Sequence, residues 1–520
     1  MGEPSQPKLL AIPEQPPPEP SAAAEREERK FKPIDRAQTR MQQFCPEDLI
    51  DEDHKARSIW DLTGELDLSA FAAATKSREG ASGRPAWDPQ LLVSVWLYAY
   101  SEGIGSARRI ARLMEYEPGL RWLSGCEVVN HHTLSDFRVG HQEALDQLFT
   151  DLLSLLDQMD VISLERLMHD GTKIRSQAGS DTFRRKRTLQ GRLEEAKELL
   201  KELGDPASEE EPRSRKEAAE RRARKQRQER LEAARAELEE LRSGVKAEQR
   251  DKVRVSLSEP EARIMKHGDH ALAPSYNAQL STDAAHGVVV GVRLTQSASD
   301  AGELEASIDE VQRRLERDPV QVVVDGGFTN RATIKTMQER GVDLIGSLPS
   351  RAERTAAGLK AKGIDPAFGP AAFIWDEATH TLRCPAGHEM ESLGGSQKRG
   401  NQYRQYRARG SDCTGCEFQR RCCPQPEQGR MVSLLEREDE LVASFRERME
   451  GEEAREIYRQ RGPVAEFPNA WIKERIGLRK FRLRGLAKAT TELLWACLTV
   501  NVMIWKRLCW KPAGTELAAA

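Results

Sequence analysis

The apolar residues in the first third of the chain recur at helical spacing. Between residues 46 and 156, the segment LLVSVWLYAYSEG predicts a buried helix that ends at Gly103. SARRIARLMEYE predicts a second helix that begins after a serine cap. A third helix is expected to begin at Thr133, which forms a capping-box pattern with Asp136. This order is typical of a helix-turn-helix domain, and a plain helical bundle produces the same pattern.

Between residues 184 and 250 the chain is almost entirely polar, with apolar residues at steps of three and four. These positions are Leu189, Leu193, Ala196, Leu200 and Leu203, and then Leu231, Ala234, Leu238 and Leu241. The spacing predicts a helical hairpin or coiled coil that is broken at GDPASEEEP. Its basic stretch RRARKQRQER alternates with acids, so a solvated helix face is a better interpretation than a DNA contact.

After Ser256 the pattern changes to that of strands. SYNAQLSTD and GVVVGVRLTQ predict adjacent strands joined by a turn at His286 and Gly287, and GELEASIDEVQRRLER predicts an amphipathic helix. VQVVVDGGFTNRATIKTMQERG then predicts a strand, a glycine-rich turn and a capped helix, and VDLIGSLP predicts one more strand. The order indicates an α/β core with a mixed sheet.

Composition narrows the classes of protein that fit this pattern. The chain has 520 residues and a formal net charge of −3, so any affinity for nucleic acid has to come from local patches. It shows neither a secretion signal nor an apolar stretch long enough to span a membrane, and we expect a cytoplasmic protein. The nine cysteines are an odd number, which argues against a disulfide framework.

Two acids follow apolar runs, Asp170 in LMHDGTKIRS and Asp325 in VQVVVDGG. Each is expected to end a strand, and by itself each is most simply a turn residue. A carboxylate at a buried position must be paired, protonated or bound to a cation. Two strand-tip carboxylates that meet at one spot are costly unless cations lie between them.

A third acid, Glu466, lies in YRQRGPVAEFPNAWIKERIGLRKFRLRG. Lys473 follows seven residues later and is expected close to the same face of a helix. The alternative for Glu466 is a helix-surface acid paired with a neighbouring base. The basic residues beyond it suit a phosphate backbone, and they are Arg475, Arg479, Lys480, Arg482 and Arg484.

Together, DGTKI, VVVDGGF and the series Tyr458, Arg461, Glu466 and Lys473 resemble the DDE transposases of bacterial insertion sequences. The catalytic domain of that family has the RNase H-like fold of retroviral integrases. RPAWDPQLLVSVWLYAYSEGIGSARRIARLM through HTLSDFR also resembles the helical N-terminal domain of these proteins. The resemblance covers most of residues 80–510 and leaves out the charged hairpin.

The resemblance implies catalytic roles for Asp170, Asp325 and Glu466, which would hold two Mg²⁺ or Mn²⁺ ions with Asp170 bridging them. The gap from Arg461 to Glu466 is one residue longer than the commonest form, and DGGF departs from the usual motif around the second acid. The implied DNA-binding residues are Tyr458, Arg461, Lys473, Arg475, Arg479, Lys480 and Arg482.

The implied function is binding of terminal inverted repeats, followed by cleavage and joining of double-stranded DNA, by a homodimer in the bacterial cytosol. A non-catalytic DNA-binding protein derived from such an element, and a nuclease that never joins strands, are the alternatives.

Five cysteines lie in CPAGHEM and CTGCEFQRRCC, between residues 384 and 423. A C-x-x-C pair with two further thiols is the spacing of a structural zinc ribbon, and it predicts four ligands. These are Cys384, Cys413, Cys416 and Cys422, and Cys423 or His388 could replace one of them. The alternative is reduced thiols that hold no metal.

These patterns predict an RNase H-like α/β catalytic core, a mixed sheet flanked by helices, with an all-α N-terminal domain and two insertions. The expected ranges are a tail at 1–33, the helical DNA-binding domain at 34–160, the core at 161–350 and 431–510, the charged hairpin at 184–252, the zinc-ribbon-like insertion at 351–430 and a tail at 511–520.

Overall fold

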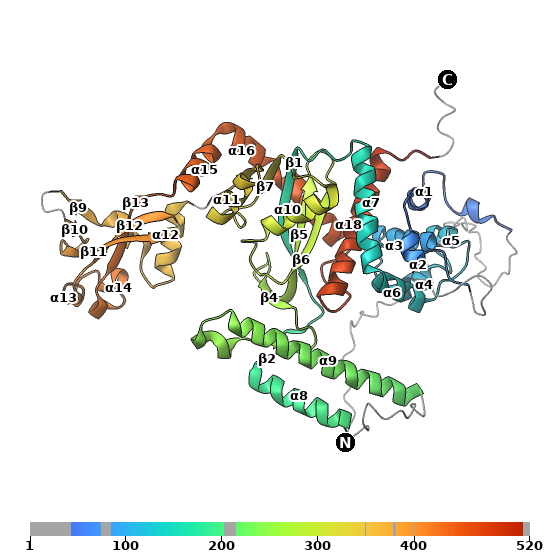
Figure 1. Ribbon diagram of the computed structural model, residues 1–520, viewed down its shortest axis with the longest axis horizontal. Helices are drawn as coiled ribbons and strands as arrows, with labels where there is room; N and C mark the ends of the chain where they lie inside the picture. Colours follow the sequence, from blue (N-terminus) through green and yellow to red (C-terminus); the bar gives the residue numbers. More distant parts are fainter. Residues whose placement is uncertain are drawn as a thin grey trace, which may run out of the picture. The chain divides into compact units, whose positions relative to one another are not determined.

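The computed structural model describes residues 43–73, 85–201, 215–348, 350–377, 381–398 and 400–512 (Figure 1). The chain divides into residues 1–45 and a second unit of residues 46–520, and every element below belongs to the second unit. The predicted tail at 1–33 and the predicted hairpin break at GDPASEEEP lie outside the described residues.

Helices make up the region before the central sheet, and a long C-terminal helix packs against them. They are α1 (Lys55–Glu65), α2 (Ser69–Ala73), α3 (Pro89–Ser101), α4 (Ala107–Leu113), α5 (Pro118–Leu123), α6 (His131–Gly140), α7 (Gln142–Gln158) and α18 (Leu486–Leu508). The predicted buried helix is confirmed as α3, and the predicted serine cap is confirmed by Ser106, which accepts the amide of Arg109. No helix within the described ranges combines the length and apolar character needed to cross a bilayer.

The third predicted helix differs from the expectation in two ways. It begins two residues earlier, at His131, because the side chain of Asn130 rather than Thr133 caps it by accepting the amide of His132 at 2.8 Å. It is also two helices, since α6 ends at Gly140 and α7 starts after a break at His141. The predicted capping box of Thr133 and Asp136 is therefore wrong.

The central sheet is mixed and has six strands, β1 (Arg166–Arg175), β4 (Arg263–Lys266), β5 (Leu272–Asp283), β6 (Val289–Thr295), β7 (Gln321–Val324) and β8 (Asp343–Gly346). Their order is β4-β5-β1-β7-β8, and β6 also pairs with β5. β1 is antiparallel to β5 and parallel to β7, which in turn is parallel to β8. The α/β arrangement predicted from the sequence is confirmed.

Helices cover both faces of this sheet. On one face Met168, Val323 and Ile345 pack against α16 (Glu452–Arg459) and α17 (Arg461–Ala470). The opposite face packs into the main core with α7, α18 and α10 (Leu304–Leu315), which lies against the sheet in Figure 1. Two more helices adjoin the sheet, α11 (Arg331–Glu339) and α15 (Glu440–Glu450).

The course of β1 corrects one prediction. Asp170 was expected to end this strand, but β1 continues through it to Arg175 because β5 pairs with β1 along its length, from Leu167 to Arg175. The parallel partner β7 stops at Val324, so one side of β1 has no neighbouring strand beyond that point. Asp325 does follow the end of its strand, as predicted.

Two further parts extend from the sheet. In the first, α8 (Lys186–Lys201) and α9 (Arg215–Ser243) lie side by side (Figure 1). They pack through Leu189, Leu193, Leu231 and Leu238, and the short strands β2 (Phe183–Arg184) and β3 (Val255–Ser256) adjoin them. The second holds a sheet of β9 (Ile374–Asp376), β10 (Thr381–Arg383), β11 (Glu389–Lys398), β12 (Asn401–Arg407) and β13 (Met431–Arg437), with α12 (Arg351–Lys360), α13 (Gly410–Cys413) and α14 (Gln419–Cys422).

A buried amide on α18 closes the edge of the central sheet at Val289. The side chain of Asn501 accepts the backbone N–H of Val289 at 2.9 Å and donates to its carbonyl at 2.8 Å. Both residues are fully buried, so water cannot replace these bonds. The Asn501 amide thus forms with one residue of β6 the two backbone hydrogen bonds that a neighbouring strand would form.

We expect Asn501→Leu to lower the free energy of unfolding by about 2–5 kcal/mol, because it leaves two buried backbone groups unpaired. Urea denaturation measures this. Thr499→Val, on the same helix, is the control, since the hydroxyl of Thr499 only bonds to a carbonyl of its own helix. Equal effects of the two substitutions would contradict the prediction.

Candidate active site

Asp170 and Asp325 lie beside each other at the end of β7. The last paired residues of the two parallel strands are Met168 and Val323, and two further steps of this register bring Asp170 level with Asp325. Equivalent residues of adjacent parallel strands point to the same face, here the face that α17 covers. The structure therefore brings together two of the three predicted acids.

Helix α17 and the π-helical turn after it present three polar side chains to the segment of β1 around Asp170. Asn469 donates from Nδ2 to Asp170 Oδ2 at 2.9 Å, and Arg461 Nη1 lies 3.7 Å from Asp170 Oδ1. Lys473, in the π-helical turn Trp471–Arg475 that follows α17, hydrogen-bonds the hydroxyl of Thr172. Two cations and an amide thus partner the acidic segment of β1.

Glu466 is placed differently from the expectation. It is exposed on α17, whereas Ala465 and Asn469 form the buried face of the helix. The π-helical turn changes the angle between successive residues, so Glu466 and Lys473 do not share the face that regular helical spacing predicts. Within the described ranges, no group of three or more His, Cys, Asp or Glu side chains is placed to hold a metal ion.

The predicted DNA-binding residues fall into two sets. Tyr458 lies under the Arg461 guanidinium, at 6.0 Å from ring centre to Cζ, and is therefore near the acids. The segment around Lys480 runs alongside the far end of β1, where Phe481 N donates to Arg175 O at 2.8 Å. Arg475, Arg479 and Lys480 are exposed there.

Arg482 has a structural partner instead. Its guanidinium lies 3.3 Å from the carboxylate of Glu492, which is completely buried. The backbone amide of Arg482 donates to the same carboxylate at 2.8 Å. Moving this arginine onto a phosphate would leave a buried charge without its ion pair, which costs several kcal/mol. We therefore leave Arg482 out of the DNA-contacting set that we propose below.

The environment of Asp170 favours its protonated form. Burial raises the pKa of Asp170 to about 6, Arg461 opposes this rise, and the nearby carboxylate of Asp325 adds to it. The same environment acts on Lys473, because burial lowers its pKa while Asp170 opposes that change. A carboxylate with a raised pKa beside a second acid is a common property of catalytic and metal-binding sites.

His169, the neighbour of Asp170 on β1, has the opposite shift. It is completely buried, and burial lowers its pKa to about 4 although the hydrogen bond to Gln279 opposes this. Its Nδ1 lies 2.9 Å from Ser281 Oγ and its Nε2 lies 3.0 Å from Gln279 Oε1. The histidine is therefore a neutral member of a buried network.

The residues that meet here fit a divalent cation in their chemistry. Mg²⁺ prefers carboxylate and amide oxygens, and Asp170 and Asp325 supply two carboxylates side by side. Asn469 is buried, and no donor among the described residues reaches its Oδ1. A buried oxygen without a donor requires a partner of some kind, such as water or a cation.

The five cysteines of the second sheet line one small cavity of about 20 Å³. They are Cys384, Cys413, Cys416, Cys422 and Cys423. Burial raises the pKa of the Cys422 thiol, and Cys413 and Cys384 add to the rise. The thiols therefore lie near one another, although in the described ranges they are not arranged as a metal-binding group.

Sequence reasoning missed Asn469, Thr172 and Asp300, which lie at or beside the acids. Asn469 follows Ala465 and precedes Lys473 by four residues, so helical spacing from Lys473 was a usable signal. Thr172 follows Asp170 by two residues, so strand alternation indicates a shared face. Asp300 lies in the loop QSASDAGE, and nothing in that loop sets it apart from an ordinary turn acid.

Comparison with known proteins identifies two domains. Residues 383–506 match the family model described as "Transposase DDE domain", and residues 44–140 match the one described as "Transposase domain (DUF772)". The chain therefore carries a transposase DDE domain and a second transposase domain, as its resemblance to DDE transposases predicted. A domain of this kind implies hydrolysis and transesterification of DNA phosphodiester bonds, and DDE transposases generally use divalent metal ions.

The DDE match includes Glu466 but begins after Asp170 and Asp325. Among solved structures, the chain is similar to a cryo-EM structure of the piggyBac transposase synaptic complex with hairpin DNA. It is 9% identical to that protein over 90% of this chain and 83% of the other, with a TM-score of 0.25, a likeness that supports no argument. The comparison with curated proteins finds no match.

The two pKa shifts predict opposite responses to acid. Asp170 binds its proton near pH 6 when folded and near pH 3.8 when unfolded, so acidification through this window stabilises the folded protein. His169 takes up its proton near pH 6.5 when unfolded and near pH 4 when folded, so acidification destabilises it. Each effect amounts to about 1–2 kcal/mol between pH 7 and pH 5.

Urea denaturation of the metal-free protein at pH 7 and pH 5 tests these signs. Relative to the wild type, Asp170→Asn should lose stability as the pH falls, because it lacks the favourable protonation. His169→Gln should gain stability over the same interval, because it lacks the unfavourable one. Parallel pH dependence in the two variants would show that the burial of these side chains does not control their titration.

Proposed function

We propose that this transposase binds the terminal inverted repeats of its insertion sequence, cuts the DNA there and transfers the strand through Asp170, Asp325 and Glu466. The observation that carries the proposal is the side-by-side position of Asp170 and Asp325 where β7 ends, with cationic groups of Arg461 and Lys473 close by. We assign the mixed sheet to an RNase H-like core, and the helical region before it to DNA binding.

Cleavage of a phosphodiester bond needs both negatively and positively charged side chains. Attack of water or of a 3′-hydroxyl on a phosphodiester builds negative charge on the entering and leaving oxygens, which bound divalent ions stabilise. Asp170 and Asp325 would hold Mg²⁺ or Mn²⁺, and Glu466 would complete the set after its side chain turns toward them. Arg461 and Lys473 then position the phosphates, and Tyr458 is suited to stack on a DNA end.

The path of the remaining DNA is proposed from the exposed basic run. Arg475, Arg479 and Lys480 lie beside the end of β1, five or more residues beyond Asp170. Phosphate contacts of this kind fix the position of a duplex without reading its sequence. Synapsis of two DNA ends would require two copies of the chain, and we propose a homodimer.

We expect Asp170→Asn, Asp325→Asn and Glu466→Gln each to reduce strand cleavage by about 10²–10⁴-fold, because each removes stabilisation worth several kcal/mol in the transition state. Binding to element ends should stay near the wild-type level, since no positive charge is lost. The measurements are cleavage of a labelled terminal repeat and a mobility-shift titration.

Glu453→Gln is the matched control, because Glu453 is an exposed acid on the adjacent helix α16. Cleavage by Glu466→Gln at the rate of this control would remove Glu466 from the site. Cleavage by Asp170→Asn at the wild-type rate would contradict the whole assignment.

The exposure of Glu466 favours a second candidate, a DNA-binding protein that has lost catalysis. In that case the wild-type protein binds terminal repeats and cuts none of them in Mg²⁺ or Mn²⁺. A nuclease of the same fold would cut them and fail to join the released 3′ end to target DNA, which a strand-transfer assay detects.

We also propose that Cys384, Cys413, Cys416 and Cys422 bind one structural Zn²⁺, because all four line the same cavity. Elemental analysis should find about one zinc per chain, and Cys413→Ser should lose it, since structural sites need four ligands. Cys509→Ser is the control, because Cys509 packs elsewhere, against the main core. Zinc-free wild-type protein whose thermal midpoint is unaffected by chelators would rule the site out.

A further inference from the structure

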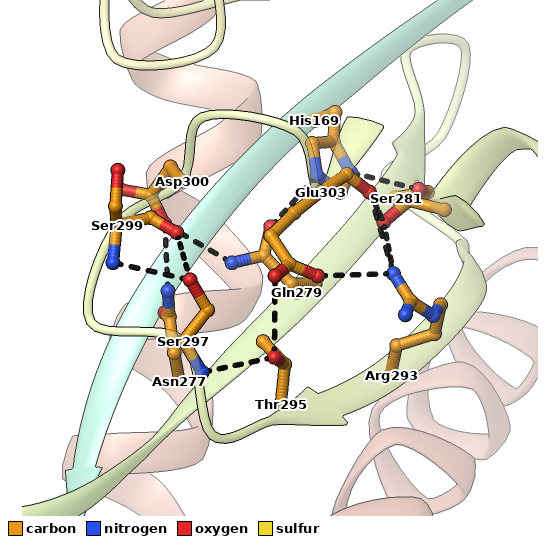
Figure 2. A network of polar contacts seen from close by, with 11 residues as sticks. His169, Asn277, Gln279, Ser281, Arg293, Thr295, Ser297, Ser299, Asp300 and Glu303 are labelled. Atoms are coloured by element: carbon orange, nitrogen blue, oxygen red, sulfur yellow. Dashed lines mark hydrogen bonds and ion pairs between the residues drawn. The ribbon is translucent and has the colours of Figure 1, made fainter. Parts of the chain in front are cut away.

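A third carboxylate, Asp300, approaches β1 from the face opposite α17. It lies in the loop between β6 and α10 (Figure 2). There it is directly against Gly171. A Cβ atom on Gly171 would overlap the Asp300 carboxylate and lie 2.8 Å from Gln279 Nε2. The glycine after Asp170 therefore provides the space that Asp300 occupies.

Asp300 is also close to the loop that follows β7. A Cβ atom on Gly327 would lie 3.7 Å from Asp300 Oδ2 and 3.0 Å from Asp325 Oδ1. Because β7 has already ended at Val324, no strand separates the two faces of the sheet here. Asp300 thus borders the same opening as the acids on the other face.

One oxygen of Asp300 is fully engaged and the other is not. Oδ1 accepts from Asn277 Nδ2 at 2.7 Å and from Gln279 Nε2 at 3.1 Å, as Figure 2 shows. Among the described residues, no hydrogen bond reaches Oδ2. A carboxylate that is held through one oxygen and open at the other is suited to bind a cation with the open one.

The orientation of this carboxylate is fixed by a chain of hydrogen bonds. Since Gln279 Nε2 donates to Asp300, its Oε1 must accept from His169 Nε2–H. His169 Nδ1 then accepts from the hydroxyl of Ser281. His169, Gln279 and Ser281 are each at most 1% exposed, so the whole chain is shielded from water.

A second observation concerns the buried amide oxygens beside these acids. Asn277 is completely buried, and although its Nδ2 holds Asp300, no donor in the described part of the chain reaches its Oδ1. On the other face, Asn469 donates to Asp170, and no donor in the described part of the chain reaches its buried Oδ1. Each of these buried amide oxygens belongs to a side chain that contacts an acid, and a buried oxygen without a donor requires a partner such as water or a cation.

We propose that Asp300 is a further ligand of the divalent cation at the active site, reached when the other acids close around the ion, and that Asn277, Gln279 and His169 orient it. This inference rests on the proposed function, because it adds a carboxylate to the site of Asp170 and Asp325. It also gives the DG sequence at 170–171 a physical reason, since the acid binds from one face and the glycine admits Asp300 from the other.

The experiment measures Mn²⁺ binding to the full chain by electron paramagnetic resonance of the free ion, together with thermal midpoints in EDTA. Asp300→Asn should weaken Mn²⁺ binding by about tenfold or more. Its midpoint in EDTA should equal or exceed that of the wild type, because one of several neighbouring negative charges is gone. A purely structural role predicts a lower midpoint instead. Asp309→Asn, an exposed acid on α10, is the control.

Gly171→Ala tests the same site with the carboxylate retained. The added methyl group displaces Asp300, so Mn²⁺ binding should fall as it does in Asp300→Asn. Gly191→Ala is its control, because a Cβ atom there meets no neighbouring atom. This variant decides the question if Asp300→Asn proves unstable.

The outcomes separate this inference from the proposed function. Wild-type Mn²⁺ binding by Asp300→Asn and Gly171→Ala, with binding lost in Asp170→Asn, would overturn the role of Asp300 and leave the proposed function standing. Wild-type binding by Asp170→Asn as well would overturn the metal site of the proposed function, and this inference with it.

Discussion

The parallel register of β1 and β7 forces two carboxylates to lie side by side. The two negative charges repel each other, and the surrounding polar and cationic groups offset that repulsion. Asp170 and Asp325 come level because their strands pair two residues earlier. Arg461 and the amide of Asn469 contact Asp170, and Lys473 hydrogen-bonds Thr172, two residues further along the strand. A site that concentrates negative charge in this way is preorganised for a cation, because the cost of bringing the acids together has already been met during folding.

The unequal lengths of the two strands give the site its shape. β1 spans residues 166–175 with β5 beside it, whereas β7 stops at Val324. The gap next to β1 lets groups from both faces of the sheet approach one point, with α17 on one side and the loop before α10 on the other. An opening at the carboxyl end of a strand is a frequent position for functional sites in open α/β sheets.

The sequence predicted the strands of the core well because their apolar runs are short and bounded by turn residues, as VQVVVDGG illustrates. It also located Asp325 correctly at a strand end. The sequence did not predict the length of β1. Pairing with β5 extends this strand through Asp170 and Gly171, and that pairing is a long-range contact. Helical periodicity likewise misplaced Glu466 because it assumes a regular helix, and the π-helical turn at Trp471–Arg475 breaks that assumption. Asp300 had no sequence signal because its neighbours come from other strands.

The π-helical turn after α17 has a geometric consequence for the acid upstream of it. A turn of this kind contains one residue more than an α-helical turn, so displacing it along the helix rotates each residue that it passes by about 100°. Glu466 lies one position beyond Ala465, which packs on the sheet beside Asp170. A shift of the helix by one residue would therefore turn Glu466 from solvent toward β1. Pro468, which lacks an amide hydrogen, lies within the segment that would have to shift.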